Sequence, residues 1–290
     1  MMRVLVVYKR SFLEAHKGDR ALWRRLPIAD RRRFRLADRE NRAALDDVMG
    51  ALRRAGAQAT AVYRGLLAAS PRFDLIVSVG GDGTFFMAAH RAHGTPIFGI
   101  NSHPGGSLGL FTAADRASFR PKLKAALDGR LKPVRLNRMT LEINGRPHPD
   151  LALNDILIAH RIPASLSRLA VSVDGSAEEI QRSSGIWIST AAGSTAAIRA
   201  AGGHRMPVAS KRLQYLVREP YDWPTRVRRR RGYAKTGLDF RILMSEASLW
   251  IDGVRTRVDL KIGDRVRLRT GGEPAVVLGF DARRRDRLFP

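Results

Sequence analysis

Short apolar runs alternate with helix-spaced apolar residues through the first part of the chain. The runs that predict buried strands cover residues 3–8, 59–63, 74–79 and 95–101. Between the first two, apolar residues at helical spacing predict a helix over residues 41–56, with Gly56 as its C-terminal cap. Residues 9–40 are polar and basic and predict a helical or loop insertion. Alternating strands and helices predict a Rossmann-like parallel sheet, with its ligand beyond the carboxyl ends of the strands.

The pattern changes after about residue 133, where apolar and polar residues begin to alternate with the period of a half-buried strand. The clearest alternating runs are residues 139–143, 169–173, 249–252, 264–269 and 275–280. Turn pairs such as Asn144-Gly145 and Asp174-Gly175 separate such runs. We therefore predict two domains: an α/β domain over residues 1–132 and a β-rich domain over residues 133–290.

Composition narrows the class of protein. No cysteine is present among the 290 residues, which excludes disulfides, thiolate metal sites and cysteine nucleophiles. No apolar run reaches the roughly 18 residues of a membrane span, so we expect a cytoplasmic protein without a membrane partner. The net charge of +25 favours anionic ligands. The arginine clusters at 31–35, 228–231 and 283–285 are more typical of solvated surface than of binding sites.

A glycine-rich turn, Gly80-Gly81-Asp82-Gly83-Thr84, follows the run at 74–79 and precedes an apolar segment that predicts a helix from residue 85. Glycines let a phosphate approach the backbone, and the free N–H groups of a helix start point toward it. The carboxylate of Asp82 repels phosphate. It is better suited to accept a proton from a hydroxyl or to bind a metal ion that carries the phosphate. The turn therefore indicates phosphoryl transfer to an alcohol.

Further segments carry polar groups at predicted strand ends. A glycine-rich loop begins at Gly99-Ile100-Asn101, and Asn154-Asp155 precedes an apolar strand. The small-residue segment 190–196 offers hydroxyls and backbone N–H groups that suit a sugar, a base edge or a phosphate. Each segment alone is more often a turn or a helix cap than a binding site, but their joint order is far more specific.

That order resembles the NAD kinase family. The family's motifs are a GGDGT turn, a glycine-asparagine loop that ends near Leu108-Gly109, an Asn-acid pair, and a Gly-Ser-Thr-Ala segment after a strand. The resemblance extends from Val4 to about Phe280, and finer features such as Arg218-Glu219-Pro220 point to the mitochondrial-type branch and its bacterial relatives.

The resemblance implies phosphorylation of the adenosine ribose 2′-hydroxyl of NAD, or of NADH, by ATP or inorganic polyphosphate with Mg²⁺. Asp82 would be the catalytic residue, and no protein ligand set for a metal is expected. The donor phosphates would be bound by Gly80, Gly81, Gly83, Thr84, Asn101 and Arg218. The residues implied for NAD are Asn154, Asp155, Ser184, Thr190, Ala191, Gly193, Ser194 and Thr195.

Some positions depart from the family pattern and leave alternatives open. Ser184 replaces an acidic residue and Ala197 an aromatic one, at positions that hold the nicotinamide half of the substrate, so the choice between NAD and NADH stays open. The family commonly pairs its β-rich domains, so a homodimer is expected, with a tetramer as the alternative. One rival is a lipid kinase of the diacylglycerol or sphingosine type. The other is a degenerate, non-enzymatic nucleotide or nucleic-acid binder, although nucleic acid is not the expected partner.

Overall fold

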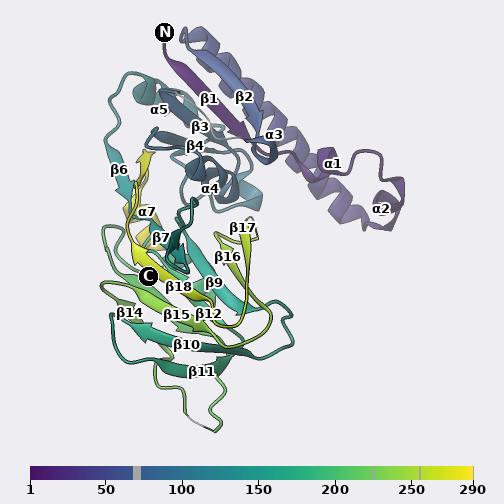
Figure 1. Ribbon diagram of the computed structural model, residues 1–290. Helices are drawn as coiled ribbons and strands as arrows, with labels where there is room; N and C mark the ends of the chain where they lie inside the picture. Colours follow the sequence, from purple (N-terminus) through teal and green to yellow (C-terminus); the bar gives the residue numbers. More distant parts are fainter. Residues whose placement is uncertain (68–72, 225, 255, 290) are drawn as a thin grey trace. The chain divides into compact units, whose positions relative to one another are not determined.

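The computed structural model describes residues 1–67, 73–224, 226–254 and 256–289 (Figure 1). The chain divides into two compact units. Unit 1 combines Met1–Val134 with Ala275–Arg285, and unit 2 covers Arg135–Pro274 and the residues from Asp286 onward. The sequence predicts one boundary after residue 132. The structure differs at the C-terminal end, because residues 275–285 return to unit 1.

Unit 1 is built on a sheet with the order β2-β1-β3-β4-β19-β6, in which β5 also pairs with β4. Its strands are β1 (Arg3–Tyr8), β2 (Gln58–Tyr63), β3 (Leu75–Val79), β4 (Ile97–Asn101), β5 (Ala114–Asp115), β6 (Pro133–Leu136) and β19 (Ala275–Leu278). The β1, β2, β3 and β4 pairings are parallel, as predicted. The run at 275–280 is predicted as a strand of the β-rich domain. Instead, β19 pairs in parallel with β4, because its residues are buried on both faces and do not alternate.

Helices separate and follow the strands of this sheet along the chain. They are α1 (Phe12–Ala15), α2 (Arg20–Arg25), α3 (Ile28–Arg54), α4 (Asp82–His90), α5 (Phe119–Leu127) and α7 (Ala282–Leu288), with short 3₁₀ turns η1 (Arg64–Leu66) and η2 (Pro104–Gly106). The predicted helix at 41–56 is the second half of α3, whose buried Ala44, Val48 and Leu52 pack against the sheet. No helix in the described ranges combines the length and apolarity that a membrane crossing requires.

Unit 2 contains two antiparallel sheets, with the orders β11-β10-β15-β18-β7-β8 and β14-β13-β12-β9-β16-β17. The first contains β7 (Met139–Ile143), β8 (Arg146–Pro147), β10 (Ser167–Val173), β11 (Glu179–Ser183), β15 (Leu238–Ile242) and β18 (Arg265–Thr270). The second contains β9 (Asp155–His160), β12 (Ile186–Ser189), β13 (Leu213–Val217), β14 (Arg231–Ala234), β16 (Ala247–Ile251) and β17 (Thr256–Leu260). The turn η3 (Gly193–Thr195) and helix α6 (Ala197–Ala200) follow β12.

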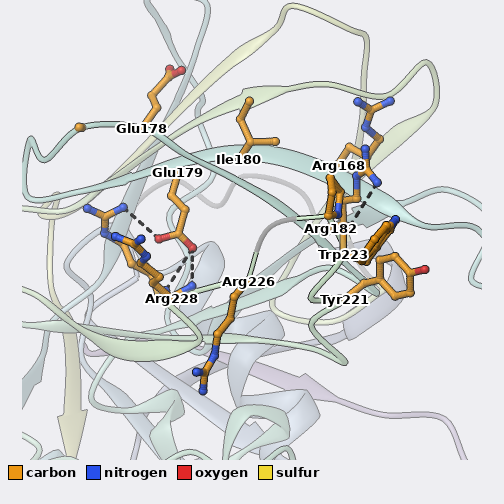
Figure 2. A pocket seen from close by; sticks show the side chains of 12 residues that line it. Arg168, Glu178, Glu179, Ile180, Arg182, Tyr221, Trp223, Arg226 and Arg228 are labelled. Carbon is orange, nitrogen blue, oxygen red and sulfur yellow. Dashed lines mark hydrogen bonds and ion pairs between the residues drawn. The ribbon is translucent and has the colours of Figure 1, made fainter.

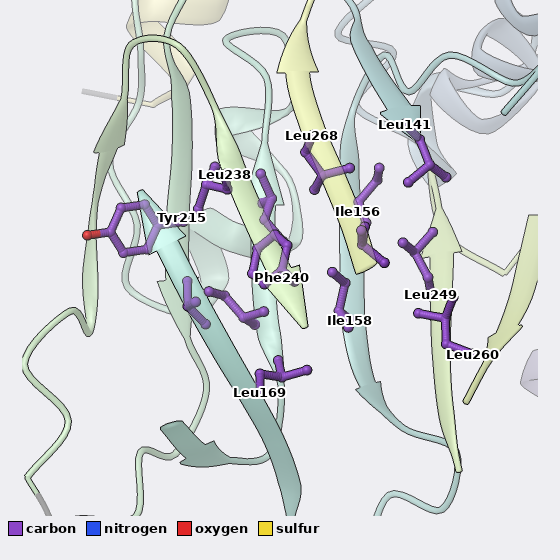
Figure 3. Packing of buried hydrophobic residues seen from close by; sticks show 14 of the residues in the cluster. Leu141, Ile156, Ile158, Leu169, Tyr215, Leu238, Phe240, Leu249, Leu260 and Leu268 are labelled. Atoms are coloured by element: carbon purple, nitrogen blue, oxygen red, sulfur yellow. The ribbon is translucent and has the colours of Figure 1, made fainter. Parts of the chain in front are cut away.

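The core of unit 2 is formed by apolar side chains from both sheets, such as Leu169, Phe240 and Leu268 of one and Ile156 and Leu249 of the other (Figure 3). The predicted period-two alternation explains this packing, because every second residue of a strand points to the same face. In β18, the residues that alternate with the core positions Val266 and Leu268 are the exposed, charged Arg265 and Arg267. The chain thus consists of an α/β unit and a β-rich unit, which confirms the predicted fold class.

Candidate active site

The carboxyl ends of the parallel strands in unit 1 bring polar residues to one edge of the sheet. Lys9 follows β1, Arg64 follows β2, the turn beginning at Gly80 follows β3, and Asn101 ends β4. Parallel strands that lie side by side end at the same edge, where α/β sheets hold their ligands. This edge therefore combines the predicted glycine-rich turn with two cations that the sequence reasoning did not assign to a site.

Asp82 is the first residue of α4, which begins three residues before the predicted start at residue 85. The side chain is partly exposed. Its Oδ1 accepts a hydrogen bond of 2.8 Å from the backbone N–H of Phe111, so the carboxylate has a defined orientation. Within the described part of the chain, Oδ2 accepts no hydrogen bond. A carboxylate with one oxygen fixed and the other available can receive a proton from a bound hydroxyl.

Close packing explains the glycines of the turn. A Cβ at Gly80 would lie 2.3 Å from Oγ1 of Thr84, which is closer than real atoms approach. Thr84 is buried, and its hydroxyl accepts a hydrogen bond of 3.3 Å from Nη1 of Arg64. Gly83 is exposed, so its backbone is accessible to a ligand. The turn therefore presents backbone N–H groups at the start of α4, with a guanidinium beside them.

A second cation, Lys9, lies near Arg64. Burial, and then the charge of Arg64, lower the pKa of Lys9 from its ordinary value. Two cations held together cost electrostatic energy unless an anion lies beside them. The pair therefore favours a polyanionic ligand at this edge.

Asn101 organises the loop that follows β4. Its Nδ2 donates to the carbonyl of Ser107 at 2.9 Å, and its Oδ1 accepts from the N–H of His103 at 3.2 Å. A Cβ at Gly81 would lie 2.2 Å from Oγ of Ser107, so the loop packs directly against the glycine-rich turn. Two guanidinium bonds from Arg284, to the carbonyls of residues 108 and 109, hold the far end of the loop. The two predicted glycine-rich segments are thus adjacent in unit 1.

A separate group of predicted site residues comes together in unit 2 around Asn154 and Asp155, where β9 begins. The carboxylate of Asp252 accepts hydrogen bonds of 2.7–3.0 Å from the backbone N–H groups of residues 153, 154 and 155. The Nδ2 of Asn154 donates to Asp155 at 3.2 Å. Its Oδ1 is buried without a hydrogen-bond partner among the described residues. A buried amide oxygen with no partner is costly, so a ligand that donates a hydrogen bond would be stabilised here.

The small-residue segment after β12 packs against the same backbone. Thr190 Oγ1 donates to the carbonyl of Leu153 at 2.6 Å, and its N–H donates to the carbonyl of Asn154 at 3.1 Å. Ser194, which is fully buried, donates to the carbonyl of Ala191 at 2.8 Å. Gly193 and Thr195 belong to η3, which continues this segment. Asn154, Asp155 and most of the predicted NAD-binding residues therefore form one group.

The environment of Asp155 changes its acidity. The side chain is almost fully buried, and burial, followed by the negative charge of Asp252, raises its pKa to about 7. At neutral pH the group is therefore divided between acid and carboxylate. In the acid form it can donate a hydrogen bond, which an ordinary ionised aspartate cannot do.

The raised pKa of Asp155 predicts a pH dependence of stability. The native state binds an extra proton between the unfolded pKa near 3.8 and the native value of about 7, so stability falls as pH rises through this window. Asp155→Asn should remove that decline, which can reach about 4 kcal/mol because each pKa unit corresponds to about 1.4 kcal/mol. Thermal unfolding measured from pH 4.5 to 8.5 checks this.

The matched control is Asp259→Asn. Asp259 is exposed, and hydrogen bonds from Ser248 and then Arg257 hold its pKa below the usual range, so this variant should keep the decline. A decline of equal size in Asp155→Asn and the unsubstituted chain would show that Asp155 does not cause it.

Ser184 and Arg218 do not join the Asn154 group. The N–H of Ser184 donates to the carbonyl of Arg218 at 3.0 Å, where β12 begins and β13 ends. Asp155 pairs with Ser189, at the other end of β12. Arg218, predicted to bind donor phosphate, belongs to unit 2, whereas the glycine-rich turn belongs to unit 1. Their roles in binding stay predictions.

The sequence does not predict four residues that contribute to these sites: Lys9, Arg64, Phe111 and Asp252. Lys9 and Arg64 could have been found, because each directly follows a predicted parallel strand. Asp252 precedes Gly253 in a pair that is typical of turns, but nothing local shows that its carboxylate binds the backbone of residues 153–155. Phe111 contributes only a backbone N–H, which has no sequence signal.

The residues present suit only one mode of metal binding. Among the described residues, no three histidine, aspartate or glutamate side chains are arranged to hold a metal ion. Mg²⁺ commonly keeps several waters and binds through one or two carboxylates together with substrate phosphates. Asp82 beside the glycine-rich turn fits an ion that arrives on the phosphates of a ligand.

Comparison with known proteins gives consistent matches. No protein-family model matches the chain. A probable NADH kinase of Oryza sativa subsp. japonica is 36% identical over an alignment of 223 positions, which covers 67% of this chain and 67% of that one. The crystal structure of an NAD kinase from Archaeoglobus fulgidus in complex with ATP aligns with a TM-score of 0.69 at 25% identity, over 98% of this chain and 96% of that one. Yeast NADH kinase complexed with NADH aligns with a TM-score of 0.73 at 14% identity, over 97% and 84%, and supports the fold alone.

Proposed function

The chain belongs to the NAD kinase family, and from this premise we propose that it transfers a phosphoryl group from ATP or polyphosphate to the adenosine ribose 2′-hydroxyl of NAD or NADH. The observation that carries the proposal is the carboxylate of Asp82, fixed through Oδ1 by Phe111 and available through Oδ2 at the start of α4. The two rival activities, a lipid kinase and a non-enzymatic binder, are not favoured, because the relatives are named NAD kinase or NADH kinase.

The proposed reaction is a displacement at phosphorus. The ribose oxygen forms a bond to the terminal phosphorus of the donor, and the bond from that phosphorus to the leaving phosphate breaks. Asp82 accepts the proton of the hydroxyl through Oδ2 as the oxygen attacks. Phosphoryl transfer requires little covalent help from a protein, so positioning and charge stabilisation supply most of the rate.

The donor phosphates are assigned to unit 1. Backbone N–H groups of Gly81, Asp82 and Gly83 at the start of α4, together with the cations Lys9 and Arg64, suit a triphosphate or polyphosphate. The N–H groups of Gly80 and Thr84 already donate to the carbonyls of Ile100 and Gly81, each at 2.9 Å, so these two residues contribute through the shape of the turn. Mg²⁺, carried on these phosphates, would neutralise part of their charge, and Asp82 is the carboxylate within the turn that could bind it. Asn101 keeps the loop in place through its two backbone hydrogen bonds.

The dinucleotide is assigned to unit 2. The buried Oδ1 of Asn154 can accept a hydrogen bond from a ligand amino or hydroxyl group, and Asp155 can donate or accept according to its protonation. The segment that contains Thr190 and Ser194 supplies the wall beside them. Asp252 acts as a positioning residue, because it holds the backbone that carries both side chains.

A donor-by-acceptor assay tests the proposal. ATP and polyphosphate are each combined with NAD and NADH, with Mg²⁺ or with EDTA, and NADP or NADPH is measured with a coupled dehydrogenase. Phosphorylated dinucleotide should form with at least one donor and only when Mg²⁺ is present. Absence of product from every pair would refute the proposed function.

We also propose that the active form is a homodimer. Light scattering of the purified chain measures its mass in solution and tests this.

Arg64→Gln is expected to raise the KM for the phosphoryl donor by about tenfold and to leave the KM for NAD nearly unchanged. The reason is the loss of one cation beside the turn, and charge-assisted bonds to phosphate are worth about 1.5–3 kcal/mol each. Initial rates with each substrate varied in turn measure the two constants. Lys132→Gln, which removes an exposed cation elsewhere in unit 1, is the control. Equal increases in both KM values would contradict a donor-specific role.

A further inference from the structure

Unit 2 contains a cavity of about 760 Å³ that none of the predicted site residues lines, among the residues the structure describes. One wall is the β10–β11 hairpin, which supplies Arg168 and Arg182. The other wall is the segment between β13 and β14, which supplies Tyr221, Trp223 and further arginines (Figure 2). The volume is within the range of about 300–1,000 Å³ that is usual for small-molecule sites.

Arg168 and Arg182 form a like-charged pair at one end of this cavity. They are directly opposite each other on the antiparallel strands β10 and β11, where paired Cβ atoms are about 4.5–5.5 Å apart. Neither forms an ion pair with a carboxylate in the described part of the chain. Among the residues that the structure describes, the side chain of Arg182 donates only to the carbonyl of Trp223, at 3.3 Å. Like charges in this register are destabilising, so the pair is suited to a bound anion.

The acidic residues of the cavity do not neutralise these arginines. Glu178 forms an ion pair with Arg241, which lies outside the cavity lining. Glu179 accepts the backbone N–H groups of Arg228 and Arg229 and forms an ion pair of 3.3 Å with the side chain of Arg229. Within the described ranges, the guanidinium groups of Arg226 and Arg228 have no carboxylate partner. The same is true of the Arg168–Arg182 pair. The cavity therefore presents four uncompensated cations.

Aromatic surface lies beside this charge. Trp223 is 69% exposed and Tyr221 is 50% exposed, and Figure 2 shows both next to Arg168 and Arg182. Ile180, also exposed, projects from the hairpin between the two ends of the cavity. Large apolar side chains gathered at a charged cavity mark a binding surface. Guanidinium groups match phosphate geometry, and an indole ring provides a face on which a base can stack.

We propose that this cavity is a second nucleotide site, distinct from the proposed kinase site, which holds the phosphates of a nucleoside di- or triphosphate or of a dinucleotide on its arginines and the base against Trp223. This second site takes part in no chemical step, so it is separate from the phosphoryl transfer proposed above. Its occupancy by a nucleotide would relieve the repulsion between Arg168 and Arg182. The basic segment that begins at Arg226 thereby acquires a role beyond solvated surface.

Equilibrium dialysis of the full chain with radiolabelled ADP tests the second site. Arg168→Gln/Arg226→Gln should bind one ADP fewer per chain than the unsubstituted protein. Trp223→Ala should weaken this site by about tenfold or more, as expected for loss of a base-stacking ring. Inorganic tripolyphosphate has phosphates but no base, and adenosine has a base but no phosphates. Each should therefore compete at least about tenfold less well than ADP. The control Arg146→Gln/Arg212→Gln removes two exposed arginines of unit 2 and should bind ADP normally.

Three results would overturn the second site. They are an unchanged ADP stoichiometry in Arg168→Gln/Arg226→Gln, an unchanged affinity in Trp223→Ala, and tripolyphosphate binding as tight as that of ADP. Circular dichroism melts confirm that the variants are folded. The kinase assay on the same preparations separates the two proposals. If Arg168→Gln/Arg226→Gln binds one ADP fewer, the second site is supported even when no NADP is formed. If ADP binding is unchanged while NADP forms normally, the second site is refuted and the proposed kinase function is not.

Discussion

Asp82→Asn is expected to lower the rate of NADP formation by about 100-fold or more, while folding and NAD binding are retained. Asparagine keeps the size of the side chain and can still accept the 2.8 Å hydrogen bond from the N–H of Phe111 through its amide oxygen. It cannot take the proton of the ribose hydroxyl. The loss should therefore appear in kcat, with little change in the KM for NAD, in steady-state assays at saturating donor.

The matched control for this variant is Asp46→Asn, which removes an exposed carboxylate from α3 in the same unit. It should retain full activity. Binding of NAD to the Asp82 variant, measured by calorimetry, separates a catalytic role from a structural one. Turnover within a few-fold of the unsubstituted chain would remove Asp82 from the proposed mechanism.

Gly193→Ala is expected to destabilise unit 2 by about 2–3 kcal/mol and to raise the KM for NAD by at least about tenfold. A Cβ at this position would lie 1.9 Å from the carbonyl oxygen of Asn154 and 2.7 Å from its Cα. These are backbone atoms, so no rotation of a side chain relieves the overlap. The strand start that carries Asn154 and Asp155 would have to move, and overpacking of this kind typically costs about 1–3 kcal/mol.

Gly271→Ala provides the comparison for Gly193→Ala. Its added Cβ would lie 3.6 Å from Cγ2 of Thr140, an ordinary van der Waals contact. Chemical denaturation gives the stability of both variants, and initial-rate kinetics give the KM for NAD. If Gly193→Ala matches Gly271→Ala in both measurements, the close approach of residue 193 to Asn154 does not govern the site.

Much of the fold could be predicted because its signals are local. The apolar run at residues 3–8 coincides with β1, and the alternation at 139–143 coincides with β7. The position of Asp82 between β3 and the body of α4 follows from the strand-turn-helix pattern alone. Period and turn chemistry operate over a few residues, so one sequence suffices to read them.

Other features depend on partners that are distant in sequence. Asp252 bonds to a backbone segment 97–99 positions away, and only folding brings the two together. The hydrogen bond from Arg64 to Thr84 likewise joins two separate elements. The structure starts α4 three residues before the predicted position. Glycine has low helix propensity, which favours a later start, whereas the packing of the turn allows the helix to begin at Asp82.

The place of β19 in its sheet has a consequence for biosynthesis. Strands β4 and β6 are made before unit 2, yet the strand that lies between them, Ala275–Leu278, leaves the ribosome only after residues 135–274 of unit 2. Until then β4 presents open backbone groups, which are a template for association with other chains. Folding of unit 1 during synthesis therefore cannot finish before residues 135–274 of unit 2 have emerged. A nascent chain that stalls shortly before residue 275 should be prone to aggregation and to chaperone capture.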